Sequence, residues 1–382
     1  MNILQKIENL FLLMFCMIRF CFYGKADDLS HNIKNILIVA VGKLGDVVCT
    51  TPVFSAIRKE DSDIQIFVED SGGVNNEEIL ANSGLVDGYI KSKNFFLLRR
   101  EIKENKIDTV CITGLNAKTV AYMYLIGVKT IVTSVVQNGF SPQQTKTFNF
   151  LKKFVIQVPF TIGEYAPRER LRVLEPFGIF ATDTKKKLGF SKSAELRVKN
   201  YFIKNDIKVE DLIIGISPSA GNKIKKWGAE KFAKLADYIY QKYKAKIIIT
   251  GGGRDREEVI EMIRFLNKDT KFFNTLNMFN IDELKSVISK MNIFISVDTG
   301  PIYIAEAFGV ATIDIVGPMD EDEQPPRGNI NKIVKISNRK RSELHIMNSR
   351  VYNREEALRQ INEITVEMVT KEIDNLYGYI KF

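Results

Sequence analysis

Short apolar runs rich in β-branched residues alternate with longer amphipathic stretches from Lys34 onward. This alternation is typical of parallel strands joined by crossover helices. In the first half it predicts strands at 36–41, 64–68, 86–90, 107–112 and 130–135, with helices at 45–59 and 77–82. In the second half it predicts strands at 212–216, 246–250, 293–297 and 311–316, with helices at 229–242 and 256–266. We therefore expect an α/β protein with two doubly wound, Rossmann-like domains facing a cleft.

The alternation is interrupted between Gln137 and Lys192, where four prolines and a lysine triplet replace the regular pattern. We interpret this segment as an acceptor-side insertion followed by an interdomain linker. The 382-residue chain is long enough for two hydrophobic cores. The pattern thus predicts one domain at 31–190 and a second at 191–350, after an N-terminal extension at 1–30.

The extension contains a run from Leu10 to Tyr23 that is apolar apart from Arg19. This run is too short to cross about 30 Å of hydrocarbon, which needs about 20 residues. It also lacks the basic start and small-residue cleavage site of a secretion signal. Two interpretations remain, a membrane-surface helix with Arg19 and Lys25 near anionic headgroups, or a helix packed on the protein's own surface.

Composition narrows the class of protein. Lys and Arg number 55 against 46 Asp and Glu, and the formal charge of +9 favours an anionic partner without naming its class. Four cysteines without CxxC spacing predict free thiols in a reducing compartment. With His31 and His345 as the two histidines, a His-rich zinc site or a Ser-His-Asp triad is hard to assemble.

The first candidate site is the string from Gly42 to Asp46, which follows the first predicted strand and begins a helix. As a helix cap, Asp46 contributes about 1 kcal/mol. As a carboxylate at the carboxyl end of a strand, it is placed to act as a general base. Gly42 and Gly45 permit close approach of a substrate. The spacing matches neither GxxxxGK[ST] nor GxGxxG, and both roles of Asp46 stay open.

The second candidate site follows the strand at 212–216. Hydroxyls of Ser217 and Ser219, the Lys225 ammonium and the loop amides suit the oxygens of a phosphate or diphosphate. The alternative is a basic surface turn. Trp227, the one tryptophan of the chain, is predicted to be a packing anchor.

Two further strings follow strands in the second half. After TGGG, Asp255 could accept hydrogen bonds from ribose hydroxyls, although one Gly-rich turn is a weak signal. Asp298, Thr299 and Gly300 precede Pro301 at a helix start, where amides and a carboxylate suit phosphate oxygens and sugar hydroxyls. A helix cap explains Asp298 and Thr299 but not the whole string.

The strings GKLGDVVCTTPVFSAIRK and SVDTGPIYIAEAFGVATIDIVGP resemble the two signature regions of glycosyltransferase family 9, the bacterial lipopolysaccharide heptosyltransferases, and KKWGAEKFAKLA resembles a third. The resemblance covers about Asn35 to Leu376, in the family's order. It implies a GT-B fold with an N-terminal acceptor domain and a C-terminal nucleotide-sugar domain. It also implies that a closing helix within 351–382 packs back on the N-terminal domain.

The resemblance assigns a role to each candidate residue. Asp46 matches the catalytic base that deprotonates the acceptor hydroxyl for inverting attack on the anomeric carbon, and Lys225 matches the lysine that binds the donor phosphates. The resemblance implies no required metal ion. It also implies no cofactor, because the nucleotide-sugar donor is a substrate. The other matches are Gly42, Lys43 and Gly45 on the acceptor-side loop, Ser217, Ser219, Thr299 and Gly300 at the donor phosphates, and Asp298, Asp255 and Tyr303 at the donor sugar and ribose.

Some residues depart from the family pattern. Tyr303 stands where histidine is usual and Gly228 where proline is usual, so the identity of the donor sugar stays open. Two strings, Asp61-Ser62-Asp63 and Asp320-Glu321-Asp322, look like the DxD of metal-dependent glycosyltransferases. Their composition favours a solvated helix-to-strand turn for the first and a flexible acidic loop for the second.

The expected function is an inverting, metal-independent glycosyltransferase. Heptose from ADP-heptose is a candidate donor, and a lipopolysaccharide-core or related anionic glycan is the expected acceptor, at the inner face of the cytoplasmic membrane. A two-domain sugar-nucleotide epimerase remains an alternative. A non-enzymatic binder of anionic ligands or nucleic acid is a third possibility that rests on charge alone, and we expect no nucleic-acid partner.

Overall fold

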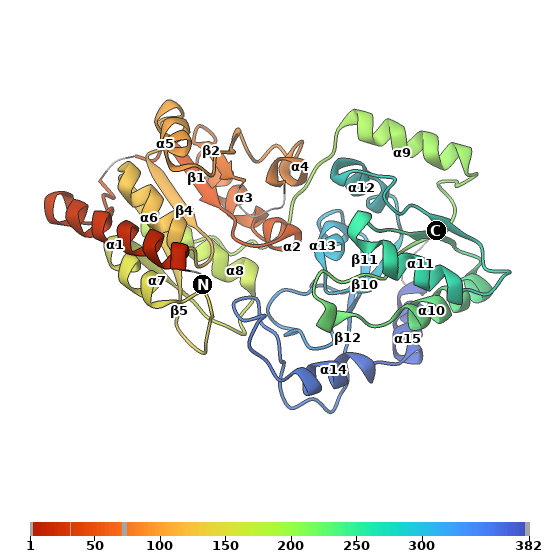
Figure 1. The fold of residues 1–382 in the computed structure, drawn as a ribbon. Coiled ribbons are helices and arrows are strands. Elements are labelled where there is room, and N and C mark those ends of the chain that lie inside the picture. Colours follow the sequence, from red (N-terminus) through yellow and green to blue (C-terminus); the bar gives the residue numbers. More distant parts are fainter. Residues whose placement is uncertain (1–2, 31, 71–74, 379–382) are drawn as a thin grey trace. The chain divides into compact units, whose positions relative to one another are not determined.

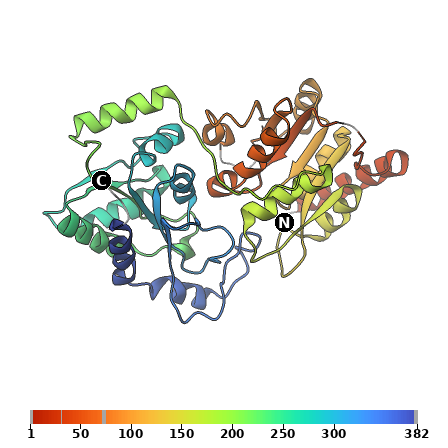
Figure 2. The same ribbon diagram turned by 180° about the vertical axis from the view of Figure 1, so that it is seen from behind.

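The computed structural model describes residues 3–30, 32–70 and 75–378. It divides into two compact units, the first holding most of the chain up to Lys185 and the second most of the chain from Lys186. The short segment Ile346–Asn348 returns to the first unit. Figure 1 shows both units, and Figure 2 shows them from behind.

Within the described residues, the first unit is built on a six-stranded sheet in the order β3-β2-β1-β4-β5-β6, and every neighbouring pair is parallel. Its apolar strand residues are buried because helices cover both faces. The strands are β1 (Asn35–Val39), β2 (Gln65–Glu69), β3 (Gly88–Ile90), β4 (Thr109–Ile112), β5 (Thr130–Val136) and β6 (Ile156–Phe160).

Helices α1, α5, α6 and α7 share one hydrophobic cluster on one face of this sheet, while α3, α8 and the 3-10 helix η2 pack together on the other. The short helix α2 follows β1. The bounds are α1 (Ile3–Tyr23), α2 (Leu44–Val48), α3 (Thr51–Glu60), α4 (Asn76–Leu80), α5 (Phe95–Glu104), α6 (Ala117–Ile126), α7 (Lys146–Leu151), η1 (Lys152–Phe154), α8 (Ala166–Leu171) and η2 (Arg172–Phe177).

Two local expectations for the first unit need correction. The single helix expected at 45–59 is two helices, α2 and α3. Pro52 lies in the first turn of α3, where backbone N–H groups have no partner within the helix, so the missing N–H of proline costs no hydrogen bond. The segment 137–192, expected to be an insertion and a linker, contains β6 as well as the helices α7 and α8 and the 3-10 helices η1 and η2 of the unit. Strand β6 was not predicted because it contains Pro159, and proline is unusual within strands. Proline is tolerated there because β6 is an edge strand.

The second unit repeats the architecture, with the parallel strand order β12-β11-β10-β7-β8-β9 in the described part of the chain. Helices α10, α11 and α15 share the core on one face, and α13 packs on β10 and β11. Strands are β7 (Ile213–Ser217), β8 (Lys246–Ile249), β9 (Phe272–Asn274), β10 (Ile293–Val297), β11 (Ala311–Ile315) and β12 (Asn331–Val334). Helices are α9 (Lys192–Lys204), η3 (Lys223–Lys225), α10 (Ala229–Tyr243), η4 (Gly253–Asp255), α11 (Arg256–Phe265), α12 (Ile281–Ile288), α13 (Gly300–Ala307), α14 (Arg354–Asn362) and α15 (Val366–Tyr377).

The closing helix α15 lies in the core of the second unit, which corrects the expectation that it packs back on the N-terminal domain. Val369, Ile373 and Leu376 recur at helical spacing and are fully buried there. Trp227 is the packing anchor that the sequence predicts, because its buried indole N–H donates to the Ile364 carbonyl at 2.8 Å, just before α15.

Helix α1 is docked on the first unit. Its Cys16 is fully buried beside α6, and the Phe20 and Phe154 ring centroids are 4.9 Å apart. No helix in the described ranges is long and apolar enough to cross a membrane. The helix is therefore packed on the protein's own surface, as one of the two interpretations expects, and its outward side remains exposed.

Candidate functional site

The predicted site strings lie at the point in each sheet where the strand order reverses. In the first unit β1 leads to β2 on one side, and the chain later returns to β4 on the other. In the second unit β7 leads to β8, and the chain returns to β10. Ligands of doubly wound sheets bind at the carboxyl ends of such strand pairs. The residues from Gly42 to Asp46 follow β1, while Ser217 ends β7 and Asp298 follows β10.

Asp46 lies in the first turn of α2 and its carboxylate has two partners. Oδ2 accepts the backbone N–H of Lys43 at 2.8 Å, so the residue does cap its helix. Oδ1 accepts a hydrogen bond from the Arg170 guanidinium at 2.7 Å. The Asp46 side chain remains 23% exposed although that of Arg170 is 2% exposed. The carboxylate is therefore oriented by a buried cation and still reaches solvent.

Gly42 is essential to this geometry. Its φ is +139°, which is rarely accessible to residues with a side chain, and a Cβ there would lie 2.3 Å from Asp46 Oδ2. Gly45 is buried in the first turn of α2, and the Lys43 side chain is exposed. The acceptor-side string thus serves chiefly to place one carboxylate.

Lys225, Asp298 and Tyr303 form a connected cluster in the second unit. Lys225 Nζ donates to Asp298 Oδ2 at 2.9 Å and also to the Asp298 carbonyl. The Tyr303 hydroxyl, on α13, donates to Asp298 Oδ1. Asp298 and Tyr303 are almost fully buried, whereas the Lys225 side chain is 15% exposed. The structure therefore brings together the predicted phosphate lysine, the predicted sugar carboxylate and the residue that departs from the family pattern.

The other residues predicted to contact the donor phosphates lie close in sequence to Lys225 or to Asp298. Ser217 is the last residue of β7 and Ser219 lies two residues on, both buried. Gly300 begins α13, so the first amides of that helix lack partners within it. Thr299 precedes α13, and its buried hydroxyl has no hydrogen-bond partner in the described structure. This edge thus offers hydroxyls, amides and an ammonium to an anionic ligand.

Asp255 follows β8, the strand next to β7, and lies at the same edge of the sheet. Its carboxylate accepts the Gly252 amide at 2.7 Å and is half-buried. The residue therefore holds its own Gly-rich turn in shape, and its role toward ribose stays a prediction.

Sequence reasoning missed four residues that support these groups. Arg170 binds Asp46 from 124 positions away, too far for any local pattern. Lys186 pairs with Glu306 at 2.6 Å and lies 5.9 Å from the Tyr303 ring centroid, although its triplet looked like a linker. Asp314 is the fourth, and the signal was available, because it is a carboxyl within the apolar strand β11.

Asp314 is fully buried, and neither of its carboxylate oxygens has a hydrogen-bond partner within the described residues. It pairs in register with Ser296, two residues before Asp298. Burial and then the charge of Asp298 raise the pKa of Asp314 well above its ordinary value. A neutral carboxyl therefore lies beneath the Lys225–Asp298 pair.

The two DxD-like strings have structural roles. Asp61 ends α3 and accepts the Asp63 amide at 2.8 Å, in the solvated turn that we expected. Asp320 accepts the amides of Asp322 and Glu323 and the Ser342 hydroxyl, so this segment is a hydrogen-bonded turn rather than a flexible loop. Across the described ranges, no three His, Cys, Asp or Glu residues are grouped so that they could hold a metal ion.

Comparisons with known proteins agree with these observations. The model of glycosyltransferase family 9 (heptosyltransferase) matches residues 129–351. Lipopolysaccharide heptosyltransferase 3 of Escherichia coli is 24% identical over 286 residues, which cover 72% of this chain and 81% of the relative.

Two solved structures share the fold over nearly the whole chain. A glycosyl transferase of family 9 from Veillonella parvula has a TM-score of 0.71 at 20% identity, covering 93% of this chain and 99% of the other. The E. coli ADP-heptose lps heptosyltransferase II has a TM-score of 0.69 at 15% identity, covering 90% and 99%. The expected α/β class with two Rossmann-like, GT-B-type units is thus confirmed, and because the family model matches more than half of the chain, this protein belongs to glycosyltransferase family 9 and is a glycosyltransferase.

Proposed function

We propose that this enzyme transfers a sugar, with inversion and without a metal ion, from a nucleotide-sugar to a lipopolysaccharide-core acceptor. The observation that carries the proposal is the Lys225–Asp298 pair, followed along the chain by the unpartnered Thr299 hydroxyl, at the carboxyl edge of β7 and β10. The relative named as lipopolysaccharide heptosyltransferase 3 supports the acceptor class. The neighbour named as an ADP-heptose heptosyltransferase supports ADP-heptose as the donor to test first.

The donor end of the reaction follows from charge. When the bond between the anomeric carbon and the diphosphate oxygen breaks, negative charge grows on the leaving diphosphate. The Lys225 ammonium, the first amides of α13 and the Thr299 hydroxyl are suited to stabilise that charge without a metal ion. Asp298 orients Lys225, and the Tyr303 hydroxyl orients Asp298 in turn, while Ser217 and Ser219 add donors. We propose that the donor sugar lies next to this cluster.

The acceptor end requires a base. We propose that Asp46 takes the proton of the acceptor hydroxyl as its oxygen bonds to the anomeric carbon from the face opposite the leaving group. Arg170 and the Lys43 amide fix the carboxylate in one orientation, which is a condition for aligned attack. Inversion at the anomeric carbon follows from a single displacement.

The acceptor class also bears on location. A lipopolysaccharide-core acceptor is a glycolipid, so we propose a cytoplasmic enzyme that works at the inner face of the cytoplasmic membrane. The formal charge of +9 is suited to an anionic acceptor and an anionic surface.

The test of the proposed function is transfer itself, followed by mass spectrometry of the acceptor with and without ADP-heptose. We expect Asp46→Asn to lower kcat by about 10²- to 10⁴-fold while leaving the donor KM unchanged, because general-base catalysis contributes on that order. Asp63→Asn, an exposed aspartate in the turn after α3, is the matched control. Full turnover by Asp46→Asn would exclude the proposed base, and a product formed without acceptor would exclude transfer.

A further inference from the structure

Helix α1 presents an exposed apolar face to the outside of the first unit. From Leu10 to Tyr23 its one charged residue is Arg19, and Arg19 lies inward, 5.4 Å from the Tyr124 ring centroid. The exposed fractions are 54% for Phe11, 51% for Phe15 and 78% for Phe22. With Met14 and Ile18, which are also exposed, these residues follow the three- and four-residue spacing of one helix face.

This face is held in place, because the opposite side of α1 is firmly docked. Cys16 is fully buried, and Leu12 and Leu13 pack against the core of the first unit. The Tyr124 hydroxyl donates to the Gly24 carbonyl at the end of the helix, and Glu8 pairs with Lys118 at 3.0 Å. In Figure 1, α1 lies lengthwise beside α6 and α7. Its outward residues are therefore a built surface of the folded unit.

The charge around this face is mainly positive, although Glu8 of α1 pairs with Lys118 and two aspartates, Asp27 and Asp28, follow the helix. Helix α1 packs against α6 and α7, which belong to the segment 109–163. That segment contains no Asp or Glu and five lysines: Lys118, Lys129, Lys146, Lys152 and Lys153. An apolar helix face bordered by lysines and rich in Phe is typical of helices that lie in the plane of an anionic bilayer surface.

We propose that the outward face of α1 docks the enzyme onto the surface of an anionic bilayer, with the helix parallel to the membrane. The apolar side chains enter the boundary between headgroups and acyl chains, and the lysines contact the headgroups. A helix that is apolar on all sides is normally buried on all sides. The first unit buries the inner side of α1, and we propose that the bilayer buries its outer side. This inference deepens the membrane location proposed above but depends on α1 and not on the transfer reaction.

The test is co-sedimentation of the full-length enzyme with vesicles of phosphatidylcholine, with and without phosphatidylglycerol. We expect Phe11→Ser/Phe15→Ser/Phe22→Ser to weaken binding to the anionic vesicles at least about tenfold, because three large apolar groups no longer leave water. Phe180→Ser/Val209→Ser, which alters two exposed apolar residues elsewhere, is the matched control and should bind like wild type. Circular dichroism and thermal melting show whether the triple variant is folded.

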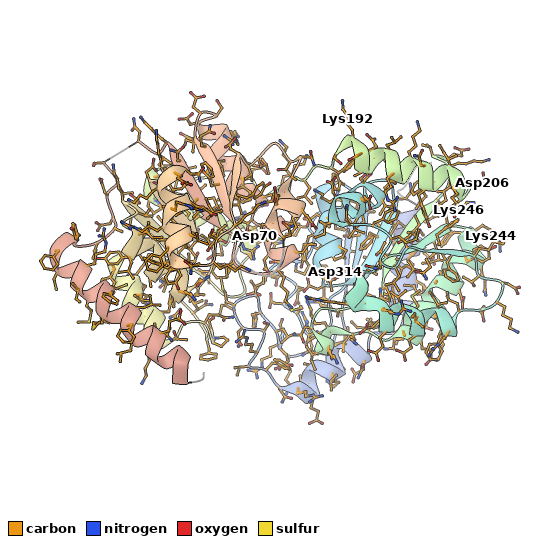
Figure 3. The ribbon with its side chains drawn as sticks, turned by 45° about the horizontal axis from the view of Figure 1, so that its top comes forward. Asp70, Lys192, Asp206, Lys244, Lys246 and Asp314 are labelled. Carbon is orange, nitrogen blue, oxygen red and sulfur yellow. The ribbon has the colours of Figure 1, made fainter. Side chains whose placement is uncertain are left out.

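The charge component is tested separately. Lys146→Glu/Lys153→Glu, lysines of α7 and η1, should weaken binding to phosphatidylglycerol vesicles, and added salt should do the same. Lys192→Glu/Lys244→Glu, exposed lysines of the second unit marked in Figure 3, make the same charge change as a control. Equal binding of wild type to neutral and anionic vesicles would overturn the role of the lysines.

Three outcomes would overturn the docking surface. They are a wild-type enzyme that does not sediment with either vesicle, a triple variant that sediments like wild type, and a wild-type dimer in light scattering that the triple variant abolishes, which would assign this face to a second copy. Asp46→Asn should still bind vesicles while losing transfer. The triple variant should still transfer sugar to a lipid-free acceptor, so failure of the docking surface and failure of the proposed function give different results.

Discussion

At the scale of the residue, two neighbours determine the position of the Asp46 carboxylate. One could be predicted from the sequence and the other could not. Gly42 stands four positions before Asp46, and its role follows from the string itself. Arg170 is 124 positions away, in a segment where arginine also occurs at 168 and 172, and only the fold shows which of the three meets the carboxylate. Local strings therefore predict groups that do chemistry, while the groups that orient them come from tertiary packing.

Gly42→Ala tests the placement of Asp46 without removing any polar group. The new Cβ would lie 2.3 Å from the carboxylate, so Asp46 must move, and a displacement of about 1 Å at a reacting group can lower the rate about 10²-fold. We expect that loss in kcat, measured by initial rates at saturating substrates. Gly163→Ala is the control, because Gly163 also has positive φ and a Cβ added there would meet no atom within 4 Å. Equal loss of kcat in both variants would mean that backbone strain, and not Asp46, is responsible.

Asp314→Asn tests the buried carboxyl beneath Asp298, labelled in Figure 3. The pKa of Asp314 is raised in the folded protein, whereas in the unfolded chain it is about 3.9. Between these values the folded state binds more protons, so this group makes the folded protein less stable as pH rises. Asparagine removes the effect, and the stability of the variant relative to wild type should increase from pH 5 to pH 8, by up to about 1.4 kcal/mol per pH unit.

Urea denaturation of both proteins at each pH measures that difference in the free energy of unfolding. A difference that stays constant over the range would show that Asp314 is ionised in the fold, which would require a partner for its buried charge. The sequence alone indicates the position, because ATIDI is otherwise apolar or uncharged. It does not indicate that Asp298 lies nearby, since that depends on the pairing of β10 with β11.

At the scale of the element, the inner strands and the edge strand β3 were predicted from the sequence, but the edge strands β6, β9 and β12 were not. The four predicted strands at 36–41, 107–112, 212–216 and 293–297 all lie at sheet centres, where burial on both faces produces continuous apolar runs. Strands β9 and β12 were missed because they have three and four residues, of which one and two are polar, so neither forms a continuous apolar run. Edge position leaves a strand partly exposed, and its sequence then resembles a loop.

The closing helix shows a different limit. An amphipathic pattern predicts that α15 has a buried face, but it does not say which core receives that face. In the structure, Asp374 of α15 accepts hydrogen bonds from two residues of α10: the Tyr238 hydroxyl donates to Oδ1 and the Lys242 ammonium to Oδ2, each at 2.8 Å. These contacts, with Trp227, commit the helix to the second unit.

Ile373→Ala measures how much α15 contributes to that unit. Ile373 is fully buried in the cluster shared with α10 and β11, so its truncation should lower the free energy of unfolding by about 2 to 5 kcal/mol. Lys371→Ala, two positions away on the exposed side of the same helix, should change it by less than about 0.5 kcal/mol. Chemical denaturation followed by circular dichroism measures the free energy of unfolding of both variants. An effect of Ile373→Ala as small as that of Lys371→Ala would contradict the placement of α15 in the core.

At the scale of the whole molecule, one topology is used twice for two kinds of chemistry. Both sheets place their site strings where the strand order reverses, yet the first supplies a carboxylate held by an arginine and the second supplies an ammonium, hydroxyls and helix amides. Fold class was therefore predictable from the alternation of strands and helices. The division of labour needed the residues at each edge, because the fold itself is common to many reactions.

This division predicts that a nucleotide stabilises the protein through the second unit. A ligand at 100 times its Kd adds about 2.7 kcal/mol, which raises the melting temperature by about 5 to 10 °C for a unit of this size. We expect ADP to do so in differential scanning calorimetry, and we expect Lys225→Ala to lose the shift relative to its own unliganded melting temperature. Lys223→Ala, an exposed lysine on the same turn, should retain it. A shift produced by UDP, GDP or CMP in place of ADP would keep the transferase and exclude ADP-heptose, whereas a shift that survives in Lys225→Ala would place the nucleotide away from the Lys225–Asp298 pair.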